Sequence, residues 1–189
     1  MKISTKEMTL VALFTGLTAI GAFVNIPLGE VPITLQTLFV ILSGLILGPK
    51  LGAFSQIVYI TLGLIGVPIL AGLTGGPQTI LKPSFGFLIG FIFASYIVGK
   101  ICNIEKGIDN KRIWLAVFIG TIVIYLFGLP YMYLILNKLM GKNLPLSIII
   151  KTGCILFLPG DILKALISSI VAIKTLPILD KSKVYRNIE

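Results

Sequence analysis

Apolar stretches long enough to cross a lipid bilayer recur along the whole of this 189-residue sequence. A helix needs about twenty apolar residues to span the hydrocarbon core, and Gly, Pro and charged residues separate the stretches here. One further apolar segment, 146–158, contains Lys151 and suits an interfacial or re-entrant position better. The sequence therefore predicts an all-α integral membrane protein with six transmembrane helices, at 5–25, 34–48, 51–67, 84–101, 113–136 and 162–179.

The scarcity of charge supports this fold class. Charged residues make up 12% of the chain and hydrophobic residues 56%, whereas soluble domains carry about 25% charged residues. The apolar residues extend through the sequence with no polar half set apart. We therefore predict one domain, residues 1–189.

The basic residues stand at the ends of the apolar runs and give a formal net charge of +9. Lys and Arg beside transmembrane helices are retained on the cytoplasmic side, so we place both termini in the cytoplasm. No basic surface interleaved with aromatic residues is evident, which argues against a nucleic-acid partner. Eleven basic residues then face the cytoplasm, namely Lys2, Lys6, Lys50, Lys100, Lys106, Lys111, Arg112, Lys174, Lys181, Lys183 and Arg186, and four face outward, namely Lys82, Lys138, Lys142 and Lys151.

Residue types required by several kinds of chemistry are missing. The sequence has no His, its two Cys residues lie far apart, and no phosphate-binding loop of the G-x-x-x-x-G-K-[ST] type occurs. No Ser, Cys or carboxylate stands in a pattern with a base that would suggest hydrolysis or acyl transfer. We expect no metal site, no cofactor and no enzymatic activity.

Asp161 and Lys164 begin the last predicted helix and lie on one of its faces, because they are three residues apart. Asp161 alone is explained as a helix cap, but an ammonium followed by apolar residues needs a partner inside the membrane. The two side chains either neutralise one another as a structural pair or offer an acceptor and a donor to a small polar ligand. Because ionisable residues within membranes are usually functional, we favour a binding site.

Other polar residues have two interpretations each. Thr34 and Gln36, at the outer end of the second helix, either line a cavity or satisfy neighbouring backbone groups. Lys82 follows a Gly-rich segment and either attracts an anionic ligand or anchors a helix at the membrane interface. Ala12 and Gly16 form a small-residue pair that allows a helix to approach closely, either within the protein or in a partner.

Four segments are similar to those of the biotin transporter substrate-binding family, BioY: VPITLQT at 31–37, LGPKLGA at 47–53, IYLFGLP at 124–130 and LPGDILKA at 158–165. The resemblance covers nearly the whole chain in the same order. It implies a six-helix S component of an energy-coupling-factor (ECF) uptake system in the bacterial plasma membrane, with both termini cytoplasmic. It also implies biotin as the transported substrate, and as partners a membrane coupling protein and two cytoplasmic ATPases.

The resemblance also assigns residues. Asp161 and Lys164 match the family's biotin-site motif. Ala12 with Gly16 stands in the place of the Ala-x-x-x-Ala motif that packs against the coupling protein, with Gly instead of the second Ala, which keeps the surface small. The chain departs from the family at 82–87, KPSFGF, where Gly-Pro-Thr-Gly-Gly-Tyr is usual. The predicted substrate-binding residues are Thr34, Gln36, Lys82, Ser84, Asp161 and Lys164.

An autonomous secondary carrier for biotin or a related vitamin is the alternative, with the buried charges serving ion coupling. The sequence shows no internal repeat of the kind many such carriers have, which argues against it.

Overall fold

The computed structural model describes residues 4–27, 29–102 and 109–181. They form a bundle of helices with one short hairpin, so the predicted all-α class holds apart from two strands of two residues each. Four basic residues that we assigned to the cytoplasm lie outside the described residues: Lys2, Lys106, Lys183 and Arg186.

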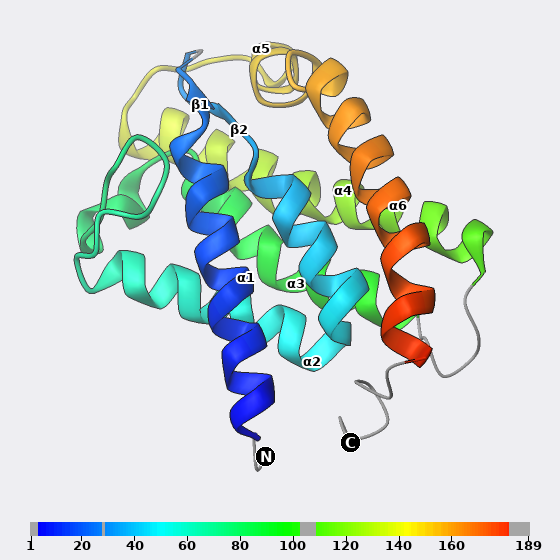
Figure 1. The fold of residues 1–189 in the computed structure, drawn as a ribbon. Helices are drawn as coiled ribbons and strands as arrows, with labels where there is room; N and C mark the ends of the chain where they lie inside the picture. The colour runs from blue at the N-terminus through cyan, green and yellow to red at the C-terminus, as the bar shows by residue number, and fades with distance from the viewer. Residues whose placement is uncertain (1–3, 28, 103–108, 182–189) are drawn as a thin grey trace.

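The first helix, α1, spans Thr5–Phe23 and ends two residues earlier than predicted. Ser4 and Glu7 form a capping box, in which each side chain bonds the backbone N–H of the other and satisfies otherwise unpaired N–H groups. The chain then forms strands β1, Asn25–Ile26, and β2, Ile33–Thr34, which pair antiparallel. This hairpin lies at the opposite end of the molecule from the first turn of α1 (Figure 1).

The second and third predicted helices form a single kinked helix, α2, which spans Gln36–Leu64. The prediction of a helix from residue 34 was wrong because Thr34 belongs to β2. The predicted break is present as the kink: Gly48 takes a φ of 78°, which favours glycine, and Pro49 cannot donate a backbone hydrogen bond. Figure 1 shows the two halves of α2 running in different directions.

Helix α3, Phe85–Ile101, fits into the bend of α2. A Cβ atom at Gly99 would lie 2.4 Å from the backbone nitrogen of Pro49, and one at Gly44 would lie 2.4 Å from the carbonyl oxygen of Ser95. The hydroxyls of Ser43 and Ser95 hydrogen-bond across the same contact at 2.8 Å. Glycines thus allow the α2 and α3 backbones to approach closely, as small residues commonly do between membrane helices.

The remaining helices complete the bundle. Helix α4 spans Asn110–Leu134 and continues into a π-helical turn, Ile135–Leu139. The segment predicted to be interfacial contains helix α5, Leu146–Ile150, and a second π-helical turn, Lys151–Ile155, before α6, Leu158–Lys181. Helix α6 packs against α2 and α4, and α3 packs against α4.

Four helical segments are long and apolar enough to cross a membrane: Thr5–Phe23, Gln36–Leu64, Asn110–Leu139 and Leu146–Leu179. Helix α3 is a shorter apolar helix. Large apolar side chains such as Leu13, Phe118 and Ile162 are exposed, which suits a surface in contact with lipid. The chain is therefore a multi-pass membrane protein. The first turn of α1 and the last turn of α6 lie at the same end of the bundle (Figure 1).

Candidate functional site

A cavity of about 380 Å³ opens near the hairpin end of the molecule. Its walls come from the β1–β2 hairpin, the start of α2, the loop after α2, the start of α3, and parts of α4 and α6. The structure brings together every residue that we predicted for a binding site, since all six line this cavity: Thr34, Gln36, Lys82, Ser84, Asp161 and Lys164.

Asp161 and Lys164 form a buried ion pair in the cavity wall. Lys164 Nζ lies 2.7 Å from Asp161 Oδ1, and the two residues are only 7% and 8% exposed. Asp161 stands in the first turn of α6, where the positive end of the helix dipole stabilises its charge. Lys164 also donates to the Thr34 carbonyl at 2.8 Å and to Thr37 Oγ1 at 3.1 Å. The pair therefore ties the last helix to β2 and the start of α2.

Tyr125 of α4 completes this group, and the sequence analysis gave it no role. Its hydroxyl donates a hydrogen bond to Asp161 Oδ2, and its ring packs edge-on against Phe87 at 6.2 Å between centroids. A carboxylate has about four lone-pair sites, so Asp161 can still accept N–H groups of a ligand after bonding Tyr125 and Lys164. Tyr125 was missed because it lies within an apolar run, where a single Tyr is normally part of the packing.

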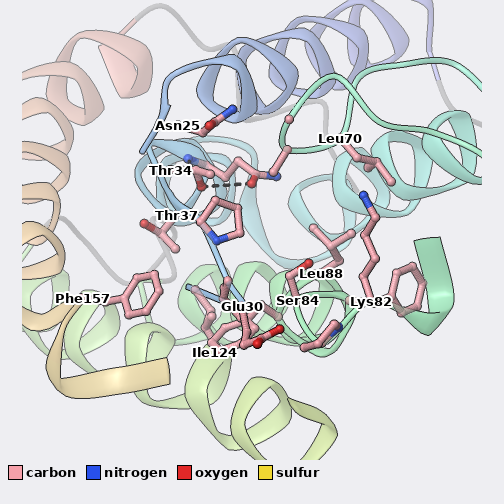
Figure 2. Close-up of a pocket in the computed structure, with 18 of the residues that line it drawn as sticks. Asn25, Glu30, Thr34, Thr37, Leu70, Lys82, Ser84, Leu88, Ile124 and Phe157 are labelled. Atoms are coloured by element: carbon pink, nitrogen blue, oxygen red, sulfur yellow. Dashed lines mark hydrogen bonds between the residues drawn. The ribbon is translucent and has the colours of Figure 1, made fainter. Parts of the chain in front are cut away.

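A second series of hydrogen bonds begins at Thr34, beside the ion pair, and leads into the bundle. Thr34 Oγ1 donates to Gln36 Oε1 at 3.0 Å (Figure 2), and Gln36 Nε2 donates to the Tyr59 hydroxyl at 2.8 Å. Tyr59, which is fully buried, donates in turn to the Ile69 carbonyl at 3.0 Å. These bonds connect the hairpin to the loop that carries Leu70, another residue of the cavity wall. Gln36 thus has a structural role as well as a position in the cavity.

The hairpin is fixed over the cavity by contacts to the other side of the bundle. Val31 is 6% exposed and packs in a small apolar cluster with residues of α4 and α5, including Met132 and Ile149. Glu30 forms an ion pair with Lys142, which follows α4. Two contacts therefore hold the loop between the strands in place: the apolar packing of Val31 and the ion pair of Glu30.

The rest of the lining is mostly apolar. Leu70, Leu88, Phe91, Ile124 and Phe157 contribute walls between the polar groups. A largely apolar cavity with a few placed polar groups is typical of a small-molecule site. Among the described residues, no group of three or more potential metal-ligating side chains occurs.

Ala12 and Gly16 lie away from the cavity, on the exposed side of α1. A Cβ atom at Gly16 would meet nothing within 4 Å. Packing within the described protein therefore does not use this small-residue surface.

Comparison with known proteins identifies the family. A family model described as the BioY family matches residues 1–181. A probable biotin transporter BioY of Pyrococcus horikoshii is 41% identical over 167 residues, which cover 88% of this chain and 94% of that protein. A probable biotin transporter BioY of Lysinibacillus sphaericus is 38% identical over 169 residues, which cover 89% of this chain and 86% of that protein.

A solved structure supports the same family assignment. The crystal structure of the S-component for biotin from an ECF-type ABC transporter superposes with a TM-score of 0.68 and 30% identity, over 90% of each chain. The matched proteins are transport proteins rather than enzymes, in agreement with the expected absence of enzymatic activity. The fold, the helical membrane segments and the sequence together show that this chain belongs to the BioY family.

Proposed function

We propose that this chain is the substrate-capture (S) component of an ECF-type uptake transporter and that it holds biotin in the cavity. The observation that carries the proposal is the buried group of Asp161, Lys164 and Tyr125 in the cavity wall. The names of the matched relatives, and the biotin S-component with the same fold, support the choice of ligand. Biotin is bound as the transported substrate, and no cofactor takes part.

The chemistry of biotin suits the lining. Its fused ring system carries two ureido N–H donors, and the spare lone pairs of Asp161 are buried acceptors for such donors. The apolar wall, including Phe91 and Ile124, suits the sulfur-containing ring and the aliphatic chain. Thr34, Gln36, Lys82 and Ser84 complete the proposed binding site.

We place the cavity on the outer side of the plasma membrane of a bacterial cell, with both termini in the cytoplasm and six crossings when the halves of α2 are counted separately. The kink at Gly48 and the common end of the bundle shared by the first turn of α1 and the last turn of α6 support this arrangement. The excess of Lys and Arg on the proposed cytoplasmic side supports its orientation.

The proposed partners are a membrane coupling protein and two cytoplasmic ATPases, which supply the energy for release. The exposed small-residue surface of α1 at Ala12 and Gly16 supports a close helix contact with the coupling protein.

Gly16→Leu is expected to reduce ATP-dependent biotin uptake at least about tenfold, because a large side chain holds the partner helix away from α1. Biotin binding by the isolated chain should change by less than about twofold, since Gly16 does not line the cavity. Uptake in vesicles and equilibrium binding in detergent measure the two effects. Leu13→Ala, on an exposed apolar position of the same helix, is the control for a general effect on α1. Unchanged uptake by Gly16→Leu would exclude this surface as the coupling contact.

Reconstitution in liposomes tests the proposed function itself. The purified chain alone should bind labelled biotin without accumulating it, and addition of the coupling module with ATP should give accumulation. Concentrative uptake by the chain alone would instead establish the autonomous carrier, for which the buried Asp161–Lys164 pair could serve ion coupling. Absence of biotin binding would reject the proposed ligand.

A further inference from the structure

Lys164 has no free hydrogen with which to bind an anion. A lysine ammonium has three N–H donors, and here they bond Asp161 Oδ1, the Thr34 carbonyl and Thr37 Oγ1. A ligand carboxylate at Lys164 would have to displace one of these buried bonds and would lie beside the negative charge of Asp161. The Asp161–Lys164 group therefore suits a neutral, N–H-bearing part of a ligand rather than its anionic part.

The cavity nevertheless has an excess of positive charge. Of the residues that the structure describes, four charged ones line it: Glu30, Lys82, Asp161 and Lys164. Asp161 neutralises Lys164, and Glu30 is neutralised by Lys142 outside the lining. The charge of Lys82 is not neutralised, because no carboxylate within the described residues lies within ion-pair distance of its ammonium. A ligand with a single negative charge would balance the site.

Lys82 also stands apart from the buried pair. Figure 2 shows Lys82 on the opposite side of the pocket from Thr37, the residue that accepts a hydrogen bond from Lys164. Ser84, which directly precedes α3, lines the cavity close to Lys82 in the sequence, and its hydroxyl makes no capping hydrogen bond to the start of that helix. One side of the cavity thus offers acceptors for N–H groups, and the other offers a cation and a hydroxyl.

We infer that Lys82 binds the carboxylate of the substrate and makes this chain selective for the free acid over its amides and esters. The inference rests on the proposed function, since it takes biotin as the ligand. It fixes the direction in which biotin lies, with the ureido ring at Asp161 and the carboxylate at Lys82. Biotin linked through its carboxyl group, as in an amide, would leave Lys82 without its counter-ion and would bind more weakly.

Lys82→Met tests this selectivity, because Met keeps the length and apolar character of the lysine stem and removes its charge. Equilibrium dissociation constants are measured in detergent for biotin and for biotinamide, a neutral ligand of almost the same shape. The unmodified chain should prefer biotin about tenfold or more, as expected for a charge-assisted hydrogen bond. Lys82→Met should lose this preference, with the affinity for biotinamide changed less than about twofold. Lys82→Arg should keep part of the preference.

Lys138→Met is the matched control, because Lys138 is exposed, belongs to the same proposed side of the membrane and does not line the cavity. It should leave both affinities unchanged. An undiminished preference for biotin in Lys82→Met, or an equal loss for both ligands, would overturn the inference and leave Lys82 as an anchor at the membrane interface. Equal binding of biotin and biotinamide by the unmodified chain would also overturn it but leave the proposed function intact. Failure to bind either ligand would reject the proposed function itself.

Discussion

Asp161→Asn is expected to weaken biotin binding by at least about a hundredfold and to destabilise the protein at the same time. Binding weakens because the proposed buried acceptor for the ureido N–H groups loses its charge; a hundredfold corresponds to about 2.7 kcal/mol. Stability falls because the ammonium of Lys164 stays buried without its counter-ion, a loss of about 3–5 kcal/mol for a broken buried pair. Lys164→Met is expected to lower the stability of the protein in the same way, since it leaves the buried carboxylate of Asp161 without its counter-ion.

The double variant Asp161→Asn/Lys164→Met separates binding from folding. It removes both charges, so its thermal stability in detergent should recover most of what either single variant loses. Biotin binding should remain lost in the double variant, because the charged acceptor is absent whether or not the fold is intact. Equilibrium binding and thermal unfolding on the same preparations give both quantities. A stable double variant that binds biotin within about tenfold of the unmodified chain would make the pair purely structural.

Gly99→Ala is expected to destabilise the protein by about 1–3 kcal/mol, although Ala is the better helix former by about 1 kcal/mol. The added methyl would lie 2.4 Å from Pro49 N and 2.5 Å from Gly48 C, both of which are backbone atoms. Because the kink of α2 cannot yield as a flexible side chain would, α3 has to move away from it. The predicted sign is thus opposite to that expected from helix propensity alone.

Gly16→Ala is the matched control for this prediction. It makes the same chemical change in another helix, where the new methyl meets nothing within 4 Å. Its melting temperature in detergent should be unchanged or slightly raised, while that of Gly99→Ala falls by several degrees. Equal melting temperatures for Gly99→Ala and the unmodified chain would show that the α2–α3 contact is looser than described.

Much of the fold could be predicted because membrane helices are recognisable in a sequence as long apolar runs. The break at Pro49 was visible in the sequence, since Pro lacks the backbone N–H that a helix requires there. Whether the chain turns back or merely bends at such a break depends on the tertiary packing of α3 against Gly48, which no local pattern contains. The hairpin was equally hidden, because strands of two residues show no periodicity.

Part of the site could also be predicted, because charged residues stand out in an apolar sequence. Asp161 and Lys164 are conspicuous, since charge is rare in an apolar helix, and their spacing predicted that both lie on one helix face. The structure shows that the two side chains form an ion pair, one of the two arrangements that the sequence left open. Tyr125 and Tyr59 were not identified as parts of the hydrogen-bonded groups, because their partners lie 36 and 23 residues away in the sequence. Only the folded chain shows that the hydroxyl of each meets a buried polar group rather than the membrane interface.

The bond from Lys164 to the Thr34 carbonyl joins residues 130 positions apart. During synthesis the hairpin that carries Thr34 leaves the ribosome long before α6, which supplies both members of the ion pair. The wall of the cavity that is made first is therefore completed only when the last helix is in place, and partly synthesised chains that lack α6 have an incomplete cavity. Ligand binding thus reports that insertion of the chain has proceeded at least as far as this helix.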